Sequence, residues 1–181
     1  KYVQFIPCLA ELDAQKPSVY ALTPQRFASF YTQLFGLWAQ ALDKGEYISV
    51  KFFDDVFNLL LKRSVTACGF TGKCQPQYVI EADGSAYPCD FFVLDEWRMG
   101  FLHKSTPQQL ANAAQTQRFL QRARTDSVLC RACRYRSFCG GGCPRMKNSM
   151  YLTQDESFCG YRAFLDACGT EIERVAQRHF M

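Results

Sequence analysis

The stretch Cys130-Arg-Ala-Cys-Arg-Tyr-Arg-Ser-Phe-Cys-Gly-Gly-Gly-Cys-Pro144 carries four closely spaced cysteines. Cysteines separated by two residues suit ligands of one metal centre, because both sulfurs converge from a single turn. The three glycines allow backbone N–H groups to approach such a centre closely and to offset its negative charge. This stretch therefore predicts a metal site built on thiolates.

The chain contains ten cysteines in 181 residues. Without a secretory signal, such a density favours metal ligands over disulfides. Eight of them lie between Cys68 and Cys159, which makes two sets of four, the number of thiolates that a four-iron cluster takes. Spacing alone does not assign each thiolate to a cluster, and it leaves zinc open as an alternative. The other two, Cys8 and Cys168, are predicted to be buried free thiols.

Composition and charge exclude several classes of protein. Hydrophobic residues make up 48% of the chain, enough for a real core, and the net charge of +4 comes from 21 basic and 17 acidic residues that are scattered along it. We therefore expect neither a nucleic-acid nor a membrane partner. No apolar run approaches the roughly 18 residues that span a bilayer, and the N-terminus lacks a signal-peptide pattern, so we expect a cytoplasmic protein.

Residues 1–65 alternate between strand and helix patterns. Residues 1–7 and 47–53 are typical of strands, and Thr23-Pro24 offers an N-cap and a first-turn proline for a helix. Because a lone strand-helix-strand unit leaves its sheet edges open, this region is interpreted as the last piece of a larger α/β domain. The predicted helix has an apolar face that we expect in the core, formed by Phe27, Phe30, Tyr31, Leu34, Trp38 and Ala41.

From residue 66 onward, cysteines and glycines replace that alternation. The Asp83-Gly84 turn between two short apolar runs predicts a β-hairpin that delivers Cys89 to a fixed place. Thr106 begins a capping-box pattern, which predicts a helix that extends toward Arg124, either continuous or broken. The apolar spacing of residues 161–175 predicts an amphipathic terminal helix.

Seven cysteines and one glycine resemble the pattern of the SPASM domain, the cluster-binding extension of many radical S-adenosylmethionine (radical SAM) enzymes. The matching run is Cys74-x9-Gly84-x4-Cys89, then Cys130-x2-Cys133-x5-Cys139-x3-Cys143, then Cys159. The resemblance implies an α/β fold class, in which residues 1–65 form the C-terminal piece of a partial radical SAM (β/α)6 barrel. Residues 66–181 would then form an α+β SPASM iron-sulfur domain with a β-hairpin and a terminal helix.

Within that superfamily, three segments are similar to the anaerobic sulfatase-maturating enzymes, which oxidise a Cys or Ser of a sulfatase to formylglycine. They are Tyr87-Pro-Cys-Asp-Phe-Phe92, Gly100-Phe-Leu102 and Cys139-Gly-Gly-Gly-Cys-Pro144, and the additional Cys68 is similar as well. The resemblance implies two auxiliary 4Fe-4S clusters that act as an electron relay and as a scaffold of the substrate site. It implies that the first is held by Cys68, Cys74, Cys89 and Cys143, and the second by Cys130, Cys133, Cys139 and Cys159.

The resemblance also implies a catalytic role for Asp90, as the base that takes a proton from the target side chain. A turn-capping role for the same carboxylate is the alternative. Arg131, Arg134 and Arg136 lie near proposed ligands, where they either stabilise a negative cluster or a peptide carboxylate, or form a solvated face.

The 181 residues contain no C-x3-C-x2-C motif, which the cluster that cleaves S-adenosylmethionine requires. We expect S-adenosylmethionine and a third 4Fe-4S cluster to be bound by a preceding N-terminal part, and the present chain to be inactive alone. The implied partners are a sulfatase polypeptide and an electron carrier such as flavodoxin or ferredoxin. Two alternatives stay open: another SPASM peptide maturase that forms thioether or carbon-carbon crosslinks, and a zinc-stabilised binding module.

Overall fold

In a computed structural model the chain forms two compact units. The first unit consists of residues 1–72 and 126–181, and the second of residues 73–125. The structure describes residues 1–10, 18–65, 67–122 and 126–181. The predicted boundary between residues 65 and 66 follows the change in sequence pattern there. Residue 66 lies outside the described residues, and the boundary stays a prediction.

Helix α1 (Pro24–Asp43) begins as the sequence predicts. The Thr23 side chain accepts a hydrogen bond from the Arg26 N–H, and Pro24 occupies the first turn. The predicted core position is confirmed for Phe27, Tyr31 and Trp38, whereas Phe30 is 39% exposed. The buried face is rotated slightly from the predicted one, and it consists of Pro24, Phe27, Tyr31, Phe35, Trp38, Ala39 and Leu42.

Strands β1 (Tyr2–Val3) and β2 (Ser49–Val50) form a two-stranded parallel sheet in which Tyr2 pairs with Ser49. The strand predicted over residues 47–53 is wrong beyond Val50, because helix α2 (Lys51–Leu60) begins at the next residue. The side chains of Phe53, Val56 and Phe57 recur at helical spacing and are all buried. Burial of this face outweighs the β propensity of the aromatic and branched residues.

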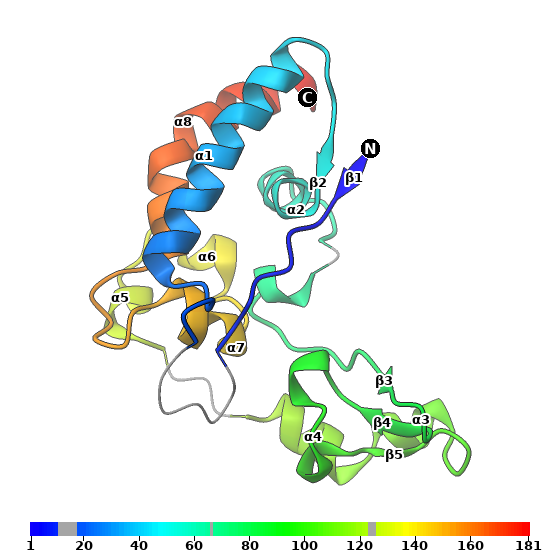
Figure 1. Cartoon of the computed structure of the whole chain (residues 1–181). Helices are drawn as coiled ribbons and strands as arrows, with labels where there is room; N and C mark the ends of the chain where they lie inside the picture. Colours follow the sequence, from blue (N-terminus) through cyan, green and yellow to red (C-terminus); the bar gives the residue numbers. More distant parts are fainter. Residues whose placement is uncertain (11–17, 66, 123–125) are drawn as a thin grey trace. The chain divides into compact units, whose positions relative to one another are not determined.

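The predicted terminal helix is confirmed as α8 (Gly160–His179), which runs beside α1 (Figure 1). Phe164 of α8 is fully buried, with ring centroids 6.5 Å from Tyr31, 6.1 Å from Phe35 and 5.3 Å from Phe52. Gly160 starts the helix at a point where a Cβ would lie 2.2 Å from the Pro24 carbonyl oxygen. Only glycine permits this approach, so α1 and α8 meet tightly at the end nearest the cysteines.

Short elements complete the first unit and carry most of its cysteines. Helix η4 is a single π-helical turn, and its residues Met150 and Tyr151 are buried in the core that α1 and α8 share. The short elements are η1 (Cys68–Phe70), α5 (Val128–Arg131), α6 (Arg136–Cys139), α7 (Pro144–Met146) and η4 (Lys147–Tyr151).

The second unit is built on an antiparallel sheet with the strand order β3 (Val79–Ile80), β4 (Ser85–Tyr87) and β5 (Gly100–Phe101). The predicted hairpin is confirmed: the Asp83 carboxylate accepts the Ser85 N–H at 2.8 Å, and Gly84 has a φ of +82°. The sequence analysis did not predict β5. The hairpin leads into two short helical turns, η2 (Asp90–Phe92) and η3 (Asp95–Trp97).

The capping box at Thr106 is also confirmed, with Gln109 as its second member. The helical stretch that it starts is broken, as the prediction allowed, because α3 (Pro107–Ala111) ends before α4 (Ala114–Leu120) begins. Arg124 lies outside the described residues. None of the helices in the described ranges combines the length and the apolar character that crossing a bilayer requires.

Candidate metal centres

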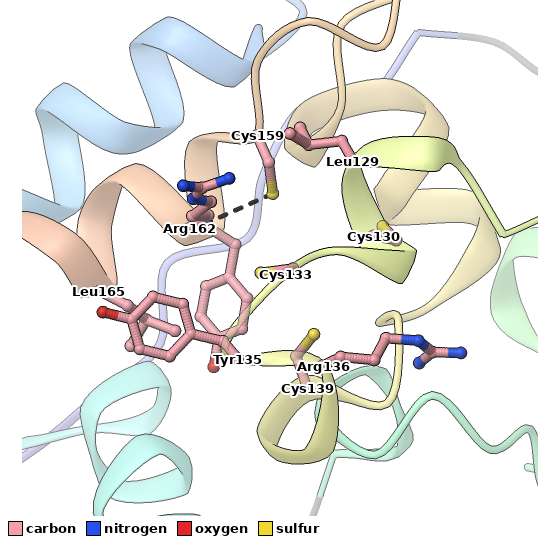
Figure 2. A pocket seen from close by; sticks show the side chains of 10 residues that line it. Leu129, Cys130, Cys133, Tyr135, Arg136, Cys139, Cys159, Arg162 and Leu165 are labelled. Atoms are coloured by element: carbon pink, nitrogen blue, oxygen red, sulfur yellow. Dashed lines mark hydrogen bonds between the residues drawn. The ribbon is translucent and has the colours of Figure 1, made fainter.

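Four of the predicted ligands line one pocket in the first unit (Figure 2). Cys130, Cys133, Cys139 and Cys159 come from α5, the turn after it, α6 and the residue before α8. Segments nearly thirty positions apart in the sequence therefore supply thiols to one place. The remaining lining residues are Leu129, Tyr135, Arg136, Tyr161, Arg162 and Leu165.

The first two thiols are placed by a capped turn. The buried Ser127 side chain accepts the Cys130 N–H at 3.0 Å and so fixes the start of α5. The Cys133 N–H then donates to the Cys130 carbonyl at 3.2 Å, which closes a turn between them. The two-residue spacing thus turns both side chains into the pocket.

The other two sulfurs each accept a backbone N–H. Gly141 donates to Cys139 Sγ at 3.4 Å, and Arg162 donates to Cys159 Sγ at 3.4 Å, the bond drawn in Figure 2. Gly141 has a φ of +86°, within the conformations that favour glycine. Cys159 is also the N-cap of α8, so its sulfur lies at the positive end of a twenty-residue helix.

Burial raises the pKa of the Cys139 thiol and of the Cys159 thiol, and the N–H donors partly oppose that rise. In the metal-free chain both groups are therefore held as neutral thiols at physiological pH. Metal binding must displace their protons, so we expect binding to weaken in acid. Arg136, paired with Asp126 at 2.7 Å, adds a positive charge to the rim.

Two observations bear on the group that this pocket suits. The Tyr161 hydroxyl is buried without a hydrogen-bond partner among the described residues, and burial raises its pKa, so a neutral O–H donor lines the pocket unpaired. Within the described ranges, no three Cys, His, Asp or Glu side chains are grouped closely enough for a single ion. Four thiols that line one pocket are the donor set that either a four-iron cluster or a tetrahedral zinc ion takes.

Of the other four predicted ligands, Cys68 and Cys143 belong to the first unit. The Cys143 N–H donates to the Gly69 carbonyl at 3.0 Å, which ties the two segments together. The same two segments also lie very close together at Gly72 and Gly140. A Cβ on either glycine would lie 2.1 Å from a carbonyl oxygen of the facing segment. Only glycines allow the two backbones to pack this closely.

Cys74 and Cys89 belong to the second unit. Both lie in a small cluster with the buried Trp97 and Phe119. Asp90 follows on the surface, where its Oδ1 lies 3.2 Å from Cys89 Sγ and accepts the Phe91 N–H at 3.0 Å. The carboxylate therefore contacts both the backbone of its own turn and the thiol of a predicted ligand.

The sequence analysis missed two arginines of the second unit. Arg118 and Arg122 are four positions apart, and both guanidinium groups stack on aromatic rings, with Arg122 also contacting the sulfur of Cys74 at 3.8 Å. Arg118 lies in α4, and Arg122 follows the end of that helix. Phe119 is close to both arginines in sequence, but Phe92 and Trp97 are more than twenty positions away.

The remaining candidates divide as follows. Cys168 is buried as predicted, whereas the prediction that Cys8 is buried is wrong, because this thiol is exposed. Arg134 is ion-paired with Asp166, and Arg131 donates to a backbone carbonyl, so neither has an exclusive role toward a thiol.

Comparison with known proteins supports both predicted resemblances. Residues 68–134 match the SPASM family model, described as an iron-sulfur cluster-binding domain. The chain is 34% identical, over 181 residues, to the cysteine-type anaerobic sulfatase-maturating enzyme of Clostridium novyi (strain NT), with 98% of this chain and 48% of that protein covered. A serine-type anaerobic sulfatase-maturating enzyme of Bacteroides thetaiotaomicron is 23% identical over 137 residues, with 75% of this chain and 32% of that protein covered.

Solved structures of an anaerobic sulfatase-maturating enzyme also match this chain. Native anSMEcpe with bound AdoMet matches with a TM-score of 0.83 at 30% identity, over 97% of this chain and 49% of that chain. The same protein with bound AdoMet and Kp18Cys peptide also gives 0.83, over 96% of this chain. The predicted fold class and the resemblance to anaerobic sulfatase-maturating enzymes with a SPASM domain are confirmed, and the chain spans about half the length of the curated relatives it matches.

Proposed function

We propose that this chain is the cluster-bearing C-terminal part of an anaerobic sulfatase-maturating radical SAM enzyme, an oxidoreductase that converts a Cys or Ser of a sulfatase polypeptide to formylglycine. The observation that carries the proposal is the pocket in which Cys130, Cys133, Cys139 and Cys159 meet, within a chain that resembles this enzyme group along nearly its whole length. The activity is that of the relatives, and we propose it for the longer protein to which this chain belongs.

The chain contributes two sets of thiolate ligands. The pocket set holds one 4Fe-4S cluster, with N–H donors from Gly141 and Arg162 supporting its sulfurs. The second set consists of Cys68, Cys74, Cys89 and Cys143. When bound, the clusters supply one-electron acceptors close to the substrate site. S-adenosylmethionine and a third cluster belong to another part of the longer protein.

Asp90 acts as the general base. Its carboxylate is exposed and lies beside Cys89, so it can accept a proton from a substrate side chain that is brought to this surface. The polypeptide substrate approaches the second unit, and an electron carrier such as flavodoxin or ferredoxin takes the released electron. We propose that these steps occur in the cytoplasm and require the longer protein, so the chain alone is inactive.

Iron and sulfide analysis of the anaerobically prepared chain tests the ligand sets. We expect about eight irons per chain, and about four after substitution of Cys130 and Cys133 by alanine. Cys168→Ala is the matched control, because this buried thiol lies on α8 and should not change the iron content. Stoichiometric zinc in place of iron would instead support the binding-module alternative.

Activity is tested in the longer protein with a peptide that carries a sulfatase motif. Formation of an aldehyde supports the proposed reaction, whereas a thioether or carbon-carbon crosslink indicates another peptide maturase. In the same protein, Asp90→Asn should keep the full iron content and lose most of the turnover. An Asp90→Asn variant with undiminished turnover would reduce this residue to a turn cap.

A further inference from the structure

Arg122 lies in an aromatic box in the second unit. Its guanidinium carbon is 3.9 Å from the ring centroid of Phe92, 4.4 Å from that of Phe119 and 5.6 Å from that of Trp97. Trp97 and Phe119 are almost fully buried, so the positive charge is held against apolar surface rather than in open water. Such a setting strengthens every electrostatic interaction that the guanidinium makes.

The orientation of the guanidinium is fixed by a hydrogen bond. Arg122 Nε donates to the Phe119 carbonyl oxygen at 3.1 Å, and this bond turns Nη2 toward Cys74, whose Sγ lies 3.8 Å away. The planar guanidinium thus donates one hydrogen bond to a backbone carbonyl and one to a sulfur. A guanidinium keeps its charge at every physiological pH, so the contact presents a permanent cation to the sulfur.

A cation at this position has a specific consequence for a thiolate ligand. Buried anionic sulfur needs a donor or a counter-charge, and groups that hydrogen-bond to ligand sulfurs shift the reduction potential of iron-sulfur clusters. Because reduction adds negative charge, a nearby fixed cation favours the reduced state and raises the potential. Arg122 contacts the sulfur of Cys74 and therefore places its positive charge beside that sulfur.

We propose that Arg122 is a positioning residue for the Cys74 ligand, donating an N–H to its sulfur and raising the reduction potential of the cluster that this sulfur helps to hold. The inference rests on the proposed function for the presence of that cluster. It adds to that function a residue that sets the driving force for electron transfer to one of the two clusters. The aromatic box contributes by keeping the guanidinium in place and water away from it.

Arg118 provides a matched control. It lies four positions before Arg122 in the sequence, and its guanidinium carbon is 4.4 Å from the Trp97 ring centroid, yet within the described part of the chain it donates to no sulfur. Arg118→Met therefore removes the same charge and the same type of stacking from the same cluster of rings. An effect that Arg122→Met shows, that Arg118→Met lacks and that Arg122→Lys partly reverses therefore indicates the contact with Cys74.

The experiment compares the wild-type chain with Arg122→Met, Arg122→Lys and Arg118→Met, all prepared anaerobically. Iron content is measured first, and redox titrations followed by electron paramagnetic resonance then give the midpoint potential of each cluster. We expect Arg122→Met to shift one of the two potentials to a more negative value and to leave the other unchanged. Arg122→Lys should recover part of the shift, and Arg118→Met should show none.

Loss of about four irons in Arg122→Met, with retention in Arg122→Lys and Arg118→Met, would equally support the positioning role. Equal iron loss in Arg122→Met and Arg118→Met would reduce Arg122 to a packing residue and overturn the inference. Full iron content with unchanged potentials in Arg122→Met would overturn it too, while leaving the proposed function intact. A wild-type chain that binds no iron would overturn both.

Discussion

Substitution of Gly140 by alanine tests the close packing between the segment after Cys68 and the triglycine loop. Gly140 has a φ of +55°, a conformation that costs an ordinary residue about 1–2 kcal/mol. Its added Cβ would lie 2.1 Å from the Thr71 carbonyl oxygen, nearly 1 Å inside the 3.0 Å limit that real Cβ atoms respect. The facing backbone must therefore move, and overpacking of this kind costs about 1–3 kcal/mol.

We expect the free energy of unfolding of Gly140→Ala to fall by about 2–5 kcal/mol, a large share of the roughly 5–15 kcal/mol typical of a domain. The movement also strains the bond from the Cys143 N–H to the Gly69 carbonyl, so the iron content should drop toward half. Urea unfolding followed by circular dichroism, together with iron analysis, measures both effects under anaerobic conditions.

Gly169→Ala is the control. Gly169 lies inside α8, with nothing within 4 Å of an added Cβ, so alanine should raise the free energy of unfolding by about 0.5–1 kcal/mol. If the free energy of unfolding of Gly140→Ala instead lies within about 0.5 kcal/mol of the wild-type value and the variant keeps its iron, the two backbones do not pack closely.

Three further substitutions probe the pocket, the core and the ion pairs. Ser127→Ala removes the N-cap that holds Cys130. We expect the free energy of unfolding in urea to fall by about 0.5–2 kcal/mol and iron to be released faster to a chelator. Unchanged release would show that the cap does not position the ligand. Phe164→Ala should cost about 3–5 kcal/mol in the same assay, since this side chain is fully buried, and a loss below about 1 kcal/mol would contradict the described core. Asp43 pairs with Arg174 at 2.8 Å, and mainly through this hydrogen bond the Asp43 pKa is lowered from 3.8 to about 2. Its stabilising effect is therefore complete above pH 3.8 and lost as the pH falls toward 2. Thermal unfolding should show Asp43→Asn less stable than the wild-type chain at pH 7 and equal to it near pH 2, and a pH-independent difference would exclude this charge effect.

Local chemistry in the sequence predicted several elements correctly. The capping residues Thr23 and Thr106 mark helix starts at the right positions, and Asp83-Gly84 marks the hairpin, because each signal depends only on a few neighbouring residues. The terminal helix was equally clear from its apolar spacing. The four cysteines of the pocket were grouped by the resemblance to a known domain, and the fold brings them together.

Features that depend on distant contacts were missed. Residues 51–53 read as a strand, yet they begin α2, because Phe53 is buried between the aromatic rings of α1 and α8. Strand β5 is only two residues long and is defined by its pairing with β4. The box around Arg122 joins rings from three separate segments, which no local pattern reveals.

Cys159 has two duties in the first unit, as one wall of the thiol pocket and as the cap of α8. Helix α8 in turn supplies Phe164, Leu165 and other residues of the aromatic core. Oxidation of this one sulfur would remove the cap of the helix, so chemical damage in the thiol pocket would also weaken the packing of the aromatic core. The integrity of that core therefore depends in part on the chemical state of a single cysteine.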